Sequence, residues 1–153
     1  MAEERWHLVE AKRDDGDAVM FRIRELEPDP TLARIFVVEL PFETTEMSKL
    51  PSATAYRRLQ AFEEQWLVPA AHALGWQFVG VRTEDGSYFL YLYGNGEPHD
   101  MIARLSPFDA ALGFYDEDDP TWREYATLRG LLDEAKSKPP ETTRMKSKPK
   151  KKR

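Results

Sequence analysis

The order of apolar patterns along the chain constrains the fold more than any other feature of the sequence. From residue 33 onward, strand-like runs and helix-like stretches follow one another as strand, helix, strand, strand, helix, strand. Strands in this order can pair in one antiparallel sheet that carries both helices on the same face. The remaining residues must then extend this arrangement at its edges.

Period-two alternation predicts the N-terminal strands. Val19, Phe21 and Ile23 alternate with more polar residues in the segment 18–26, which is typical of a half-buried strand. A similar pattern over residues 5–11 precedes it across a turn rich in Asp and Gly, so the two segments predict a hairpin. The denser apolar run that follows, over residues 33–42, indicates a strand buried on both faces.

Helical periodicity appears between residues 52 and 75. Apolar side chains recur there every three or four residues, at Tyr56, Leu59, Phe62, Trp66, Ala70 and Leu74. Ser52 or Thr54 can cap the start of this helix, and Gly75 is expected to end it. Pro69 lies inside the pattern and is expected to kink or divide the helix.

The second half of the chain repeats the alternation of strands and helices. It predicts strands over 76–84 and 88–94 joined by a turn at 84–87, a short helix over 100–107, a strand over 110–117 and a terminal helix over 120–136. The predicted fold class is therefore α+β, with a ferredoxin-like β-α-β-β-α-β antiparallel sheet, an added N-terminal β-hairpin and a C-terminal helix.

Charge is divided unevenly along the chain. Residues 136–153 hold nine Lys or Arg and one Glu, whereas the rest holds 13 basic and 26 acidic residues. A stretch so rich in Lys and Pro cannot bury enough apolar surface to order itself. We therefore predict one α+β domain over residues 1–136 and a disordered basic tail over residues 137–153.

Some classes of function are disfavoured by composition. The chain has no cysteine, which excludes disulfides, zinc–thiolate sites and a cysteine nucleophile. Its N-terminal residues hold no apolar core of a secretory signal, and no apolar run approaches the roughly 20 residues needed to span a bilayer. A cytoplasmic protein without membrane association is expected.

Four consecutive acids, residues 116–119, raise the possibility of a metal or catalytic site. Asp119 precedes Pro120, and a short acceptor side chain before a proline is typical of a helix N-cap. The favoured interpretation is a helix cap at Asp119, preceded in the chain by a strand end that is exposed to solvent. His99 beside Asp100 could form an acid–base pair, but a surface loop explains it more simply. We expect no catalytic, metal-binding or cofactor-binding residues and no cofactor.

The tail is a possible site for nucleic acid or other anions. Its clustered cations are Lys146, Lys148, Lys150, Lys151, Lys152 and Arg153. Because the remainder of the chain is strongly acidic, phosphates would be repelled from it, and binding through the tail would be weak and non-specific. The aromatic residues between 88 and 93 would bind single-stranded nucleic acid only if they faced solvent.

Several short motifs together resemble a known family. They are Trp6, Leu50-Pro51-Ser52, Gly75 ahead of the segment 78–94, and the D-x-x-W-x-x-Y of Asp119, Trp122 and Tyr125. This pattern resembles the bacterial domain-of-unknown-function 695 family, which is similar to the regulator of RNase E activity B family. The resemblance covers about residues 5–130 and implies a ferredoxin-like α/β domain. It implies no catalytic residues, and the ribonuclease regulator itself acts by binding a protein.

These observations favour a small cytosolic protein-binding or regulatory module that is not an enzyme. Its acidic body would engage a basic protein partner, with electrostatic attraction raising the rate of association. The alternative is a small enzyme or ligand-binding domain that uses a cleft near His99, Asp100 or the acids 116–119. The oligomeric state is left open.

Overall fold

One antiparallel sheet forms the centre of the molecule. A computed structural model describes residues 5–45, 48–106, 108 and 112–137. Within them, six strands lie in the order β1-β2-β4-β5-β3-β6, and every neighbouring pair is antiparallel. The strands are β1 (Trp6–Lys12), β2 (Ala18–Arg24), β3 (Arg34–Pro41), β4 (Gln77–Glu84), β5 (Ser87–Gly94) and β6 (Gly113–Asp118).

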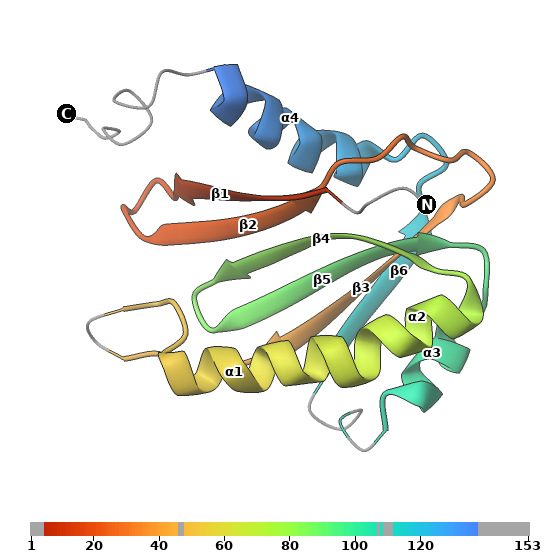
Figure 1. Cartoon of the computed structure of the whole chain (residues 1–153), viewed down its shortest axis with the longest axis horizontal. Coiled ribbons are helices and arrows are strands. Elements are labelled where there is room, and N and C mark those ends of the chain that lie inside the picture. The colour runs from red at the N-terminus through yellow and green to blue at the C-terminus, as the bar shows by residue number, and fades with distance from the viewer. Residues whose placement is uncertain (1–4, 46–47, 107, 109–111, 138–153) are drawn as a thin grey trace.

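Helices cover both faces of the sheet (Figure 1). One face carries α1 (Ala53–Phe62), the π-helical turn η1 (Glu63–Leu67), α2 (Val68–Leu74) and α3 (Pro98–Arg104). The opposite face carries α4 (Arg123–Ser137), which packs against β1, β2 and β4. The two faces are called here the α1 face and the α4 face.

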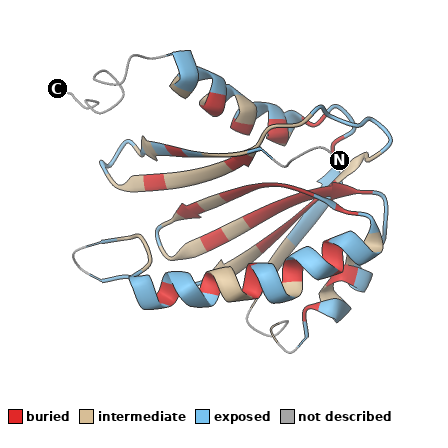
Figure 2. Ribbon diagram, viewed as in Figure 1, coloured by how far each residue is buried: buried red, intermediate tan, exposed pale blue. Residues whose placement is uncertain are grey.

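Period-two alternation on the central strands builds a core on each face. On β5, Tyr88, Leu90 and Leu92 are buried on the α1 face. Tyr91 and Tyr93, which alternate with them, are buried on the α4 face. Burial is therefore concentrated on the central strands (Figure 2). The aromatic residues of β5 do not form an open platform for nucleic-acid bases, because most of them lie in these two cores.

Turn chemistry agrees with the sequence at several points. Asp85 and Gly86 join β4 to β5 with positive φ at both residues, as a two-residue Asp-Gly turn requires. Gly75 ends α2 with φ of 78°, and the Ser52 side chain accepts a hydrogen bond from the backbone N–H of Ala55 at the start of α1. These predictions of turn, stop and cap are confirmed.

Pro69 does not break the long helix, because a π-helical turn precedes it. The backbone N–H of Val68 bonds the carbonyl of Glu63, five residues earlier, and α2 continues through Pro69. A proline cannot donate the usual helical bond, and the wider turn accommodates its missing N–H. Glu63, the first residue of this turn, lies on the buried side of the helix and is 6% exposed.

The terminal helix begins later than predicted. It starts at Arg123 rather than at Pro120, and Trp122 has a positive φ of 58°. The backbone N–H of Asp119 still bonds the carbonyl of Ala33, as an extension of the sheet, and Pro120 lies in a turn. The chain therefore turns before α4 starts. The prediction that Asp119 immediately precedes the helix is wrong, because a turn separates Asp119 from the helix that it caps.

The prediction of an α+β fold with an antiparallel sheet is confirmed. The complete strand order is not that of a four-stranded ferredoxin-like sheet, because the hairpin β1–β2 adds two strands beside β4. The boundary between the domain 1–136 and the tail 137–153 stays a prediction, because residues 138–153 lie outside the described residues. In the part that the structure describes, no helix is both long and apolar enough to cross a bilayer.

Candidate functional site

The acids 116–118 lie on the edge strand β6 and are exposed. The guanidinium of Arg34, on the neighbouring strand β3, pairs with Asp116 and lies 3.3 Å from a carboxylate oxygen of Asp118. No group of three or more His, Cys, Asp or Glu side chains among the described residues is placed to hold a metal ion. These carboxylates are therefore the solvated, partly ion-paired edge of the sheet.

Asp119 differs from its neighbours because it is buried. Its carboxylate accepts hydrogen bonds from the Tyr93 hydroxyl at 2.6 Å and from the backbone N–H groups of Arg123 at 2.8 Å and Glu124 at 3.0 Å. Burial alone would raise the pKa of Asp119, but these hydrogen bonds hold it below its ordinary value. Asp119 therefore joins the start of α4 to β5 and has a structural role.

The three histidines lie on three different elements, β1, α2 and α3. His99 and Asp100 are both exposed in the first turn of α3, and neither lines the pocket described below. The ring of His7 bonds the carboxylate of Glu25 at 2.9 Å, and His72 lies beside a separate pocket at the end of α2. The predicted cleft near His99 and Asp100 is therefore not where the structure places its main apolar cavity.

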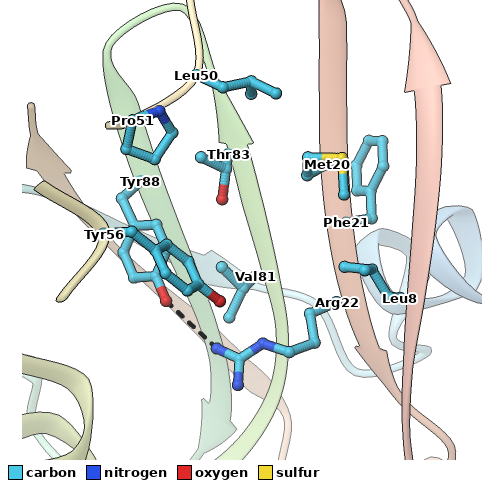
Figure 3. Close-up of a pocket in the computed structure, with 10 residues that line it drawn as sticks. All are labelled: Leu8, Met20, Phe21, Arg22, Leu50, Pro51, Tyr56, Val81, Thr83 and Tyr88. Atoms are coloured by element: carbon cyan, nitrogen blue, oxygen red, sulfur yellow. Dashed lines mark hydrogen bonds between the residues drawn. The ribbon is translucent and has the colours of Figure 1, made fainter. Parts of the chain in front are cut away.

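That cavity lies on the α1 face, between the hairpin β1–β2 and the segment that leads into α1. We call it the hairpin pocket. Its volume is about 310 Å³. Its apolar walls include Leu8, Met20, Leu50, Pro51 and Val81 (Figure 3).

The pocket exists because the hairpin widens the sheet beyond its helices. Helix α1 approaches the hairpin with Tyr56, which is 39% exposed, and leaves Leu8 of β1 70% exposed. An apolar cavity with a few convergent polar groups is the usual form of a binding site, and the exposed Leu8 extends its apolar surface at the rim. This pocket is the best candidate site among the described residues.

One side of the pocket is closed by a polar network. The Arg22 guanidinium donates to the Glu63 carboxylate and, at 3.3 Å, to the Tyr88 hydroxyl. The Tyr88 hydroxyl itself donates to Glu63 at 2.7 Å. The Arg22 guanidinium also lies over the ring of Trp6, 5.1 Å from its centroid.

These contacts fix the protonation of the network. Burial and the adjacent Glu63 carboxylate raise the pKa of Tyr88 far above its ordinary value. Burial would lower the pKa of Arg22, but its hydrogen bond to Glu63 raises it instead. Tyr88 therefore stays a neutral phenol and Arg22 a cation at neutral pH, with Glu63 as their shared acceptor.

Thr83 places a free hydroxyl inside the same cavity. The residue is only 6% exposed, and its side chain points into the pocket between the tyrosines and Met20 (Figure 3). It makes no hydrogen bond with any residue that the structure describes. A hydroxyl that lines a cavity and bonds no neighbouring residue is available to an incoming ligand.

Sequence reasoning missed this site. Arg22 occupied an ordinary polar position in an alternating strand, and the exposed face of that strand was expected to meet water. A signal was present at Glu63, which lies four residues after Leu59 and next to Phe62, within the apolar stripe of the helix. A carboxylate on a buried stripe needs a buried partner, and the structure supplies Arg22 and Tyr88.

Residues of the short motifs pack inside the fold. Trp6 packs against Phe78 with ring centroids 5.1 Å apart, while Asp119, Trp122 and Tyr125 are all buried. In comparisons with known proteins, residues 4–128 match the model of a family of unknown function (DUF695). No curated protein and no solved structure matches the chain. Because the match covers most of its length, the chain belongs to the DUF695 family.

Proposed function

We propose that this chain is a cytoplasmic, non-enzymatic protein-binding module that receives an apolar side chain of a basic partner in the hairpin pocket. The observation that carries this proposal is an apolar cavity with an exposed leucine at its rim and the Thr83 side chain, which bonds no described residue, on its wall. Such a combination favours recognition of an amphipathic group.

The polar network supports binding rather than catalysis. Arg22, Glu63 and Tyr88 satisfy one another, so the carboxylate already accepts two hydrogen bonds and is not aimed at a substrate. A general base must reach the proton that it removes, and a phenol with a strongly raised pKa is a poor acid near neutrality. The network instead holds β2, β5 and the long helix in place around the cavity.

Charge supports a basic partner. The turn between β1 and β2 carries Asp14, Asp15 and Asp17, and the neighbouring turn between β4 and β5 carries Asp85. Arg13 lies among them, 2.8 Å from Asp15 and 3.5 Å from Asp85, and compensates only part of this charge. A cationic residue beside the apolar anchor would meet this acidic end of the hairpin.

A methyl-resolved NMR titration of the full chain tests the proposal. The probe is a nine-residue peptide with a central leucine and a lysine two positions before it, matched by a peptide with serine in place of the leucine. We expect saturable shifts of the Leu8, Val81 and Thr83 methyl groups with the leucine peptide only. Equal shifts with both peptides, or shifts confined to α3 and β6, would contradict the proposal.

A second candidate function is the binding of a small apolar molecule with one hydrogen-bonding group. The Thr83 hydroxyl favours it, because a hydroxyl beside apolar walls orients a small ligand. A thermal-shift screen of wild type and Thr83→Val with small apolar alcohols and acids separates the two candidates. Hits that stabilise only the wild type would favour the small molecule.

We also propose that β4, β5, β3 and β6, with α1–α2 and α3, form a ferredoxin-like unit to which the hairpin is an addition. The order β4-β5-β3-β6 and the position of these helices on one face support this proposal. The similarity to the regulator of RNase E activity B family stays a proposal too, and it rests on the short motifs alone. An experimental structure of the chain with a different pairing of these four strands would overturn the proposal of a ferredoxin-like unit.

A further inference from the structure

Strand β1 has one edge that no other described strand covers. Two backbone hydrogen bonds show which residues of this strand face β2. The carbonyl of Arg5 accepts from the N–H of Glu25 at 2.7 Å, and the N–H of Arg13 donates to the carbonyl of Asp17 at 2.9 Å. Hydrogen-bonded pairs alternate along an antiparallel ladder. The odd-numbered residues of β1 therefore bond β2, and the even-numbered residues direct their N–H and C=O groups outward.

Leu8 combines this free edge with the hairpin pocket. It is an even-numbered residue of β1, so its backbone groups point away from the sheet, and its side chain lines the cavity while 70% exposed. In an antiparallel pair, the residue opposite Leu8 would have its Cβ atom roughly 5 Å from that of Leu8, on the same face. A long apolar side chain at that position reaches the mouth of the pocket.

We propose that an extended segment of a partner protein adds to the sheet as a strand antiparallel to β1 and places an apolar side chain opposite Leu8, in the hairpin pocket. This inference rests on the proposed function and states how the partner is held. Main-chain hydrogen bonds to the outward groups of β1 would supply affinity, and the pocket would select the side chain.

Charge on the same face specifies the rest of the segment. Glu10, the next outward residue, is exposed, so a lysine or arginine opposite it forms a favourable cross-strand pair. Lys12 follows and disfavours a second cation directly opposite itself. The partner strand therefore reads Lys-x-Leu or Arg-x-Leu in its own direction, because an antiparallel strand meets Glu10 before Leu8.

A partner protein explains this edge better than a second copy of the chain. Outside residues 136–153, the chain holds 26 acidic against 13 basic residues, so two copies brought edge to edge would repel each other. Pairing of β1 with β1 of a second copy would also bring Leu8 or another residue of β1 to the pocket mouth, and β1 contains no Lys-x-Leu sequence. The occupant is therefore a cationic, apolar strand from another protein.

The decisive experiment methylates the backbone of the nine-residue Lys-x-Leu peptide. N-methylation of its leucine blocks the N–H that would face Leu8, whereas N-methylation of the preceding residue blocks an N–H that would face away. Binding to the full chain is measured by isothermal calorimetry or fluorescence anisotropy. We expect the first change to weaken binding about tenfold, the loss of roughly one net hydrogen bond, and the second to change it less than about twofold.

Matched charge reversals test the register. Glu10→Lys is expected to weaken binding of the Lys-x-Leu peptide about fivefold and to favour binding of a Glu-x-Leu peptide instead. The control is Glu117→Lys, which makes the same change on the exposed edge strand β6 at the other end of the sheet. Circular dichroism of both variants checks folding, and both substituted side chains are exposed.

Each outcome decides a different claim. If the unmodified peptide does not bind, the proposed function fails and the strand addition fails with it. If the peptide binds in the pocket but both N-methylated forms bind equally well, the pocket function stands and the strand addition is overturned. A dimer in sedimentation that is abolished by Leu8→Asp, with no peptide binding, would assign the edge to a second copy and would also overturn the proposal.

Discussion

The hydroxyl of Tyr93 donates a 2.6 Å hydrogen bond to a carboxylate oxygen of Asp119, joining the strand β5 to the start of α4. The hydroxyl oxygen of Tyr93 also accepts a hydrogen bond from the backbone N–H of Tyr125 at 3.1 Å, and the ring of Tyr93 stacks on Trp122 with centroids 4.1 Å apart. All three residues of the D-x-x-W-x-x-Y motif therefore meet at one tyrosine. This relationship gives the three motif residues a shared structural role.

Replacing Asp119 by alanine should destabilise the fold by about 3 kcal/mol, whereas Asp116→Ala should cost less than about 1 kcal/mol. The first change leaves a buried hydroxyl and two helix N–H groups without their acceptor. The second removes an exposed ion pair, which contributes little. Urea unfolding of both variants measures the difference, and an equal or larger cost at Asp116 would contradict the structural role of Asp119.

Stability should fall at acidic pH partly through Asp119. Its pKa is lowered in the folded state, so its contribution is present above the unfolded pKa of about 3.9 and is lost as the pH falls through the folded value. The Asp119→Asn variant lacks this titration. The difference in unfolding free energy between wild type and Asp119→Asn should therefore shrink between about pH 5 and pH 2. A constant difference over that range would show that Asp119 does not titrate as described.

Much of the fold follows from local patterns, but the candidate site does not. The alternation in β2 and the Asp85–Gly86 turn depend on neighbouring residues only, and both were predicted from the sequence. The pairing of Arg22 with Glu63 joins residues 41 positions apart in the chain. No local pattern specifies such a contact, because it depends on where the hairpin docks against the long helix.

The start of α4 shows how tertiary contacts override a local signal. Asp119 before Pro120 predicted a helix at that point, yet the chain first makes a turn and begins α4 at Arg123. Trp122 is 1% exposed, stacks on Tyr93 and donates its indole N–H to the carbonyl of Leu32 at 2.9 Å. Burying that side chain outweighs the local preference for an earlier start.

The network beside the hairpin pocket gives a third prediction. Glu63→Leu should destabilise the fold by about 2–3 kcal/mol, because it leaves the Arg22 guanidinium and the Tyr88 hydroxyl without their acceptor. The side chain of Arg22 is 28% exposed, so partial rehydration limits the loss. The double variant Arg22→Met with Glu63→Leu should recover about 1 kcal/mol of this loss, because the unpaired cation is gone while the Tyr88 hydroxyl still lacks its acceptor.

A double-mutant cycle in urea measures this coupling, with Arg22→Met as the second single variant. Additive effects of the two substitutions would show that the pair does not act as one unit. The same variants report on the pocket, because Met in place of Arg22 keeps an extended side chain on its wall. Binding of the Lys-x-Leu peptide to the double variant should stay within about threefold of wild type if the network only frames the cavity.

Nucleic-acid binding, where it occurs, should be weak, non-specific and carried by the tail. The six clustered cations between Lys146 and Arg153 lie outside the described residues and offer at most about six phosphate contacts. Counterion release then gives a log–log salt slope no steeper than about −5 on duplex DNA, and the acidic body competes with phosphate for these cations. Truncation after Lys136 should therefore abolish binding in fluorescence anisotropy at low salt. Sequence-selective binding by the truncated chain would contradict this prediction and would require a second surface, since Tyr88, Tyr91 and Tyr93 are each no more than 5% exposed.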